Sequence, residues 1–160
     1  MCASVKTTPS GNAVRGIVNL SQMLRIAAAV SWTASLFLPA FTEQLASSRT
    51  DTWSGAVVLG LGWMALLIAC PAWLANPVLL WALIMWRRIR PGVLLLLVCI
   101  GIALALSWFT VPLTGGVPYD DGRHEIVSFD AGMYVWFLSF VLALAGAFVR
   151  RADQPLAGGS

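Results

Sequence analysis

The stretch RRIRPGVLLLLVCIGIALALSWFTV, residues 87–111, shows the pattern that decides the fold. Three arginines come directly before a run of apolar and small residues that carries no charge as far as residue 119. About 20 apolar residues are enough to cross the roughly 30 Å hydrocarbon core of a bilayer as a helix. Pro91 suits the first position of such a helix, because its missing N–H would have no partner there in any case. The sequence therefore predicts a membrane-spanning helix over residues 92–111.

Three other charge-free stretches lie on either side of this one, at residues 26–42, 52–86 and 131–149. We expect an all-α integral membrane bundle of four transmembrane helices, residues 25–149, between an N-terminal tail (1–24) and a C-terminal tail (150–160). The predicted spans are residues 25–41, 53–73, 92–111 and 131–149.

The stretch 52–86 is too long for one helix and too short for two. A single helix over it would be about 50 Å long at 1.5 Å per residue. Trp53 and Trp73 bracket the predicted second span as interfacial indoles would. Pro71 and Pro77 predict breaks after it, so residues 78–86 are expected to form a short interfacial or re-entrant helix. The alternative is two thin helices, which gives five spans and moves the C-terminus to the opposite side.

The charges between the apolar stretches separate by sign. With four spans and a cytoplasmic N-terminus, eight of the ten Lys and Arg residues lie on the cytoplasmic side. Six of the seven acids, all but Asp153, lie on the far side. Basic residues resist translocation, so this count predicts four spans with both termini in the cytoplasm. The short loops and compact spans indicate a protein of the bacterial inner membrane. Basic residues beside membrane ends indicate contact with anionic lipid and not with nucleic acid.

The N-terminal segment allows two interpretations. Residues 13–24 form either a helix in the plane of the cytoplasmic leaflet or a helical extension of the first span. Residues 1–12 are expected to be disordered. A cleaved signal peptide is disfavoured, because the polar segment before the apolar run is long and no small-x-small site precedes Thr42.

Small residues spaced four apart predict close helix contacts in a membrane, where packing drives association. Hydroxyl groups in the spans are expected to bond across helices or to carbonyls of their own helix. The small pairs are Ala56/Gly60, Gly101/Ala105 and Ala143/Ala147.

The sequence predicts no catalytic, cofactor-binding or metal-binding residue. No ionisable side chain lies deep in a predicted span, which disfavours ion pumps and proton-coupled transporters. Cys2, Cys70 and Cys99 form no C-x-x-C pair, which argues against a thiol oxidoreductase, and one histidine cannot supply bis-histidine haem ligation. The polar run YDDGRHE, residues 119–125, is expected to be a solvated loop. A partner-binding loop and a metal or catalytic site are the alternatives.

Two local patterns resemble those of small uncharacterised bacterial inner-membrane proteins with four helices. Residues 72–77 (AWLANP) match an A-W-x-A-N-P turn after the second span, and residues 132–139 (GMYVWFLS) match a G-x-Y-x-W-x-x-S start to the last helix. The resemblance implies no activity. From the residues themselves we expect Asn76 to cap the helix that Pro77 begins, and Tyr134 and Trp136 to anchor the outer interface.

These features predict a non-enzymatic membrane protein that acts through protein–protein contacts. An accessory subunit fits this description, and so does an immunity-type protein that blocks a toxin within the bilayer. The alternative is the protomer of a small oligomeric channel or transporter. The expected partners are the lipid bilayer and either a membrane protein or a second copy of the chain, with no nucleic acid.

Overall fold

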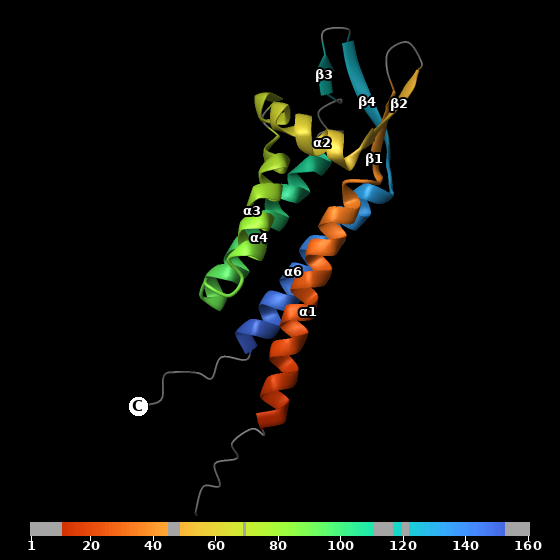
Figure 1. Ribbon diagram of the computed structural model, residues 1–160. Helices are drawn as coiled ribbons and strands as arrows, with labels where there is room; N and C mark the ends of the chain where they lie inside the picture. Colours follow the sequence, from red (N-terminus) through yellow and green to blue (C-terminus); the bar gives the residue numbers. More distant parts are fainter. Residues whose placement is uncertain (1–10, 45–48, 69, 111–116, 120–121, 153–160) are drawn as a thin grey trace, which may run out of the picture.

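The computed structural model describes residues 11–44, 49–68, 70–110, 117–119 and 122–152. The chain is mostly helical, with a small β-sheet at one end (Figure 1). The α-helices are α1 (Gly11–Ser35), α2 (Gly55–Leu61), α3 (Ala75–Ile84), α4 (Pro91–Leu106) and α6 (Ala131–Ala152). Short 3-10 helices are η1 (Gly62–Ile68), η2 (Pro71–Leu74) and η3 (Ser107–Phe109). The strands are β1 (Pro39–Gln44), β2 (Thr50–Ser54), β3 (Val117–Tyr119) and β4 (Gly122–Phe129).

Four helices, α1, α3, α4 and α6, lie lengthwise and form a bundle (Figure 1). The start of α1, the end of α6 and the turn between α3 and α4 lie at one end, and the sheet lies at the other (Figure 1). Apolar side chains of very different size, from alanine to tryptophan, fill the space between the helices. The buried core includes Ala28, Leu79, Leu83, Trp86, Leu94, Val98, Phe140 and Ala143.

Helices α1 and α6 pack along much of their length. Ala143 and Ala147, one of the predicted small pairs, are both 0% exposed. The Ser31 hydroxyl donates to the Val135 carbonyl at 3.0 Å, and the Ser21 hydroxyl donates to the Gly146 carbonyl at 3.2 Å. These bonds run between the two helices, so hydroxyl groups and small side chains hold this pair together as the sequence predicts.

The second predicted pair, Gly101/Ala105, lies at the contact between α4 and α6. A Cβ atom at Gly101 would lie 3.1 Å from the Phe140 ring. The third pair differs, because Ala56 and Gly60 in α2 are both exposed and make no such contact.

The predicted second span at residues 53–73 is wrong. Trp53 belongs to strand β2, and the chain then runs through α2 and η1 across the sheet end of the bundle before it turns into η2 and α3 (Figure 1). Gly62 marks the change from α2 to η1, and a Cβ atom there would lie 2.6 Å from the Trp73 indole, so glycine permits η2 to pack closely at this point. The Trp73 Nε1 donates to the Leu59 carbonyl at 2.8 Å, which folds this segment back on α2.

The short helix predicted at 78–86 exists, but its position differs from the prediction. Helix α3 begins at Ala75 and packs against α4, with Leu79, Leu83 and Trp86 in the core. Its apolar character all round reflects burial on one side and exposure of Trp81 and Ile84 on the other. It is therefore a helix of the bundle.

The predicted first span, 25–41, has the wrong ends. Helix α1 is continuous over 25 residues from Gly11 to Ser35, which favours the helical extension over an in-plane helix. It stops before Pro39, which disfavours a helical conformation in the residue preceding it. Residues 39–41 belong to β1. The expected disorder of residues 1–12 falls on residues 1–10, outside the described part, while Gly11 and Asn12 are helical.

The all-α prediction misses a four-stranded sheet with the order β2-β1-β4-β3. The β1–β2 and β1–β4 pairs are antiparallel, with Thr42 opposite both Thr52 and Ser128. Strands β3 and β4 form a hairpin in which Tyr119 pairs with Gly122. Two connections that are remote in the sequence, 36–54 and 110–130, therefore meet in one sheet.

Two helical segments are long and apolar enough to cross a membrane, Pro91–Phe109 and Ala131–Ala152. Their mean hydropathy values are 2.6 and 2.0. They correspond to the predicted third and fourth spans. The segments Gly55–Met64 and Pro71–Ile84 are apolar but shorter.

Candidate functional site

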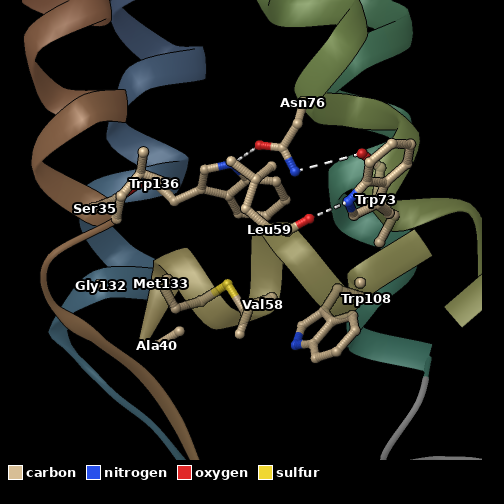
Figure 2. Close-up of a pocket in the computed structure, with 14 residues that line it drawn as sticks. Ser35, Ala40, Val58, Leu59, Trp73, Asn76, Trp108, Gly132, Met133 and Trp136 are labelled. Atoms are coloured by element: carbon tan, nitrogen blue, oxygen red, sulfur yellow. Dashed lines mark hydrogen bonds between the residues drawn. The ribbon is translucent and has the colours of Figure 1, made fainter. Parts of the chain in front are cut away.

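Asn76 lies where three helices of the bundle meet, near the sheet end (Figure 2). Its Oδ1 atom accepts a hydrogen bond from Trp32 Nε1 of α1 at 3.0 Å and another from Trp136 Nε1 of α6 at 2.9 Å. Its Nδ2 atom donates to the Trp73 carbonyl at 3.4 Å. One amide group therefore joins α1, α3 and α6, and we call Trp32, Asn76 and Trp136 the indole–amide cluster.

The local sequence places each member of this cluster. Pro71 opens η2 and Ala75 begins α3, so Asn76 sits in the first turn of α3 with its side chain directed at the other helices. Trp136 lies against Phe140, with ring centroids 5.2 Å apart and nearly perpendicular planes. Such edge-to-face contacts fix an aromatic ring in one orientation. The contact with Phe140 therefore helps to orient the Trp136 indole toward the Asn76 amide.

A cavity of about 60 Å³ adjoins the cluster. It lies between the helical bundle and α2, and Trp73, Trp108, Met133 and Trp136 form part of its wall (Figure 2). A space of that size exceeds the minimum for one water molecule. None of the described residues that line it is ionisable, so the groups that it offers to a guest are indole rings, aliphatic groups and a few hydroxyl or amide atoms.

Trp108 gives this cavity one unusual feature. Its Nε1 atom is buried and has no hydrogen-bond acceptor among the described residues. The ring is held by Phe41 of β1, with centroids 5.5 Å apart. A buried N–H without an acceptor costs roughly 1–3 kcal/mol. The indole is kept there by packing between η3 and the sheet.

Glu43 is a buried polar residue that no sequence pattern indicated. It is 3% exposed in β1, and its Oε1 accepts a hydrogen bond from Trp53 Nε1 at 2.8 Å. Nearby, the Thr42 hydroxyl donates to Asp130 at 2.9 Å, which ties the sheet to the start of α6. In the sequence Glu43 is one of the six acids expected on the far side, and no local signal distinguishes it from exposed Asp and Glu residues of loops.

The structure brings together the two patterns that the sequence analysis singled out. Trp73 and Asn76 of the first pattern meet Trp136 of the second, and both patterns line the cavity.

Asn76 does not cap α3 as expected, because its side chain makes hydrogen bonds to two indoles and one carbonyl. Tyr134 is exposed as an anchor would be, whereas Trp136 points inward. Trp32 was missed, although it lies beside the buried Ser31 and Ser35 in α1.

In the polar run 119–125, Tyr119 is the last residue of β3 and residues 122–125 are the first four of β4. Residues 120 and 121 lie outside the described part. Among the described residues, no group of three His, Cys, Asp or Glu side chains is arranged to hold a metal ion. The described cysteines, Cys70 and Cys99, are free.

No protein-family model, no curated protein and no solved structure matches this chain.

Proposed function

We propose that this chain is a four-helix membrane protein that acts as a non-enzymatic binding partner of another membrane protein. An accessory subunit or an immunity-type protein would work in this way. The proposal has two parts, which are the placement of the bundle in the bilayer and the surface that meets the partner.

The placement is supported by the outer faces of the bundle helices. Large apolar side chains are exposed along α1, α3, α4 and α6, as a lipid-facing surface requires. Pro91–Phe109 and Ala131–Ala152 cross the bilayer, and α1 and the segment Pro71–Ile84 cross beside them. The last segment has 14 residues, about 21 Å at 1.5 Å per residue, and local bilayer thinning accommodates such a short helix. Examples of exposed residues are Met23, Ile26, Trp81, Ile84, Leu96 and Val141.

The orientation is supported by charge. Arg25, Arg87, Arg88, Arg90, Arg150 and Arg151 gather at the end that holds the α3–α4 turn. The described acids Glu43, Asp51 and Asp130 lie at the sheet end. This separation favours a cytoplasmic position for the arginine end and for both termini of the chain.

The proposal of a protein partner is supported by the sheet. A bundle needs only short loops on its far side, yet here the loops form an ordered sheet fixed by Phe41, Thr42 and Asp130. Within the described residues, β2 pairs only with β1 and β3 pairs only with β4. Each outer strand therefore presents one edge of backbone N–H and C=O groups, which is a template for strand addition by a second protein.

Site-specific photocrosslinking in native membranes tests this proposal. A photoreactive amino acid is placed at Thr50 on β2 or at Val127 on β4, two exposed positions of the sheet. The matched control is Leu96 on α4, which is exposed on the lipid-facing surface. We expect a second protein, identified by mass spectrometry, to be captured from the sheet positions at several times the yield from Leu96.

Capture of only a second copy of the chain would contradict the proposal and would favour an oligomeric channel or transporter. Capture of nothing from Thr50 and Val127, in cells where the protein is at its natural level, would remove the sheet as the contact surface.

A further inference from the structure

The described residues at the end of the molecule opposite the sheet include several arginines and no acid. Arg87, Arg88, Arg90 and Arg151 are exposed there, and we call these four residues the arginine cluster. The ion pair found among the described residues, Arg49–Asp51, lies at the sheet end. No described acid lies near the cluster, so a neutralising anion has to come from outside the described chain.

The backbone beneath the cluster is fixed by two further arginines. Arg150 Nη2 of α6 donates to the Ile89 carbonyl at 2.9 Å and to the Arg87 carbonyl at 3.3 Å. Arg25 Nε of α1 donates to the Leu83 carbonyl at 2.9 Å, near the end of α3. All three bonds satisfy carbonyl groups that helix ends and turns leave without partners. The turn is therefore held by α1 and α6 together.

Trp86 anchors the same turn from inside. It is 0% exposed, and its ring fills the space that Gly146 leaves, since a Cβ atom at Gly146 would lie 3.0 Å from the indole. A turn that is held at three points loses little conformational freedom on binding. Its guanidinium groups can then hold an anion at a lower entropic cost than flexible side chains on a mobile loop.

Two buried donors at this end, Trp86 Nε1 and Arg150 Nη1, lack an acceptor among the described residues. Guanidinium groups bind phosphate oxygens through paired, charge-assisted hydrogen bonds. A phosphate group beside the turn would supply the acceptors that this charged end of the molecule lacks.

The surface next to the cluster distinguishes a lipid from a soluble phosphate. Ile84 at the end of α3 is 64% exposed, and Val93 in the first turn of α4 is 47% exposed. Each lies within three residues of an arginine of the cluster in the sequence. The phosphodiester head of a lipid could contact the arginine cluster while its acyl chains contact the neighbouring apolar surface.

We propose that the arginine cluster is a binding site for the phosphodiester headgroup of an anionic lipid, with the acyl chains lying on α3 and α4. This inference rests on the membrane placement proposed above. It does not depend on the protein partner, because the partner surface is the sheet at the opposite end. Failure of the photocrosslinking test for a protein partner would therefore leave the lipid proposal standing, and failure of the lipid test would leave the partner proposal standing.

The experiment measures thermal unfolding of the purified full-length chain in dodecyl maltoside. Three probes are added separately: dioctanoyl phosphatidylglycerol, dioctanoyl phosphatidylcholine and sodium phosphate. The variant is R87Q/R88Q/R90Q, which removes three charges from exposed side chains. The matched control is R49Q, which removes an exposed charge from the sheet end.

We expect phosphatidylglycerol to raise the unfolding temperature of the native chain and of R49Q, with phosphatidylcholine and phosphate having much smaller effects. Each cation near an anionic lipid surface is worth about 1 kcal/mol, so the triple variant should need on the order of a hundredfold more phosphatidylglycerol. Added salt should weaken the effect in the native chain.

Three results would overturn the proposal. Equal stabilisation by phosphatidylcholine would show that the acyl chains alone bind, and equal stabilisation by sodium phosphate would show a soluble anion site. An unchanged response of the triple variant would show that the lipid binds elsewhere. If the triple variant unfolds too early to titrate, lipids retained by R88Q and by the native chain are compared by native mass spectrometry, and equal retention contradicts the site.

Discussion

At the scale of single residues, Asn76 is the polar centre of the bundle. Its Oδ1 accepts from two indole N–H groups that belong to different helices, so both lone-pair directions are in use. The alternative for each indole is an unpaired donor in an apolar environment, which is unfavourable. The cluster consequently selects one arrangement of α1, α3 and α6 from the many that apolar packing alone would allow.

We predict that Asn76→Leu lowers the free energy of unfolding by roughly 1–3 kcal/mol, since two partly buried indole donors lose their acceptor while the side-chain volume is kept. Unfolding of the purified chain by SDS in dodecyl maltoside, followed by circular dichroism, measures this change. The control is a double-mutant cycle with Trp136→Phe. The second substitution should cost less in the Asn76→Leu background, because the hydrogen bond is already absent. Additive losses would show that the bond does not stabilise the fold.

At the scale of elements, the sheet and the bundle are joined by close backbone contacts. A Cβ atom at Gly132, in the first turn of α6, would lie 2.6 Å from the Pro39 carbonyl oxygen. At Gly55, where α2 begins, a Cβ atom would collide with the Ser35 carbonyl oxygen. Both glycines let the chain pass directly from strand to helix. They hold the sheet against the bundle and place Met133 and Trp136 at the cavity.

We predict that Gly132→Ala destabilises the protein by about 1–3 kcal/mol, because the added methyl group meets backbone atoms that cannot move without shifting β1. The same SDS unfolding measurement applies. Gly92→Ala in α4 is the matched control, since nothing lies within 4 Å of its Cβ position, and it should leave stability unchanged or raise it slightly. Equal effects of the two substitutions would show that helix propensity, and not the contact with Pro39, determines the result.

At the scale of the whole molecule, the bundle separates two surfaces of different chemistry. The sheet end bears the acids and the free strand edges, and the opposite end bears the arginines that hold the α3–α4 turn. In the four-span arrangement proposed above, these two surfaces lie in different compartments. A five-span arrangement would instead put β1 and β4 on opposite sides of the membrane, which is incompatible with their pairing in one sheet.

We predict that cysteines at the two ends are labelled from opposite sides of the membrane. Thr52→Cys on β2, Arg88→Cys in the α3–α4 turn and Ala152→Cys at the end of α6 are made in a chain whose own cysteines are replaced by alanine. In intact spheroplasts a membrane-impermeant maleimide should label position 52 only. After disruption of the membrane all three positions should react. Labelling of position 152 in intact spheroplasts would contradict the four-span topology.

The helices around residues 92–111 and 131–149 could be predicted from the sequence because their cause is local. An uninterrupted apolar run with charges at its ends is a property of neighbouring residues, and both segments are long apolar helices in the structure. The same holds for the small pairs Gly101/Ala105 and Ala143/Ala147, which lie at contacts. The pair Ala56/Gly60 looks identical in the sequence, yet it is exposed.

The sequence by itself determined the apolar segments, their charged ends and the residues small enough to pack, since hydropathy, charge and size belong to single residues and their neighbours. Only the tertiary structure decided the packing of Trp73 against Gly62, the sheet and the indole–amide cluster. Each of these depends on groups that are distant along the chain, such as the Trp32 and Trp136 indoles, 44 and 60 positions from Asn76. Local pattern cannot specify which distant group will satisfy a buried amide, because that choice is made when the helices pack.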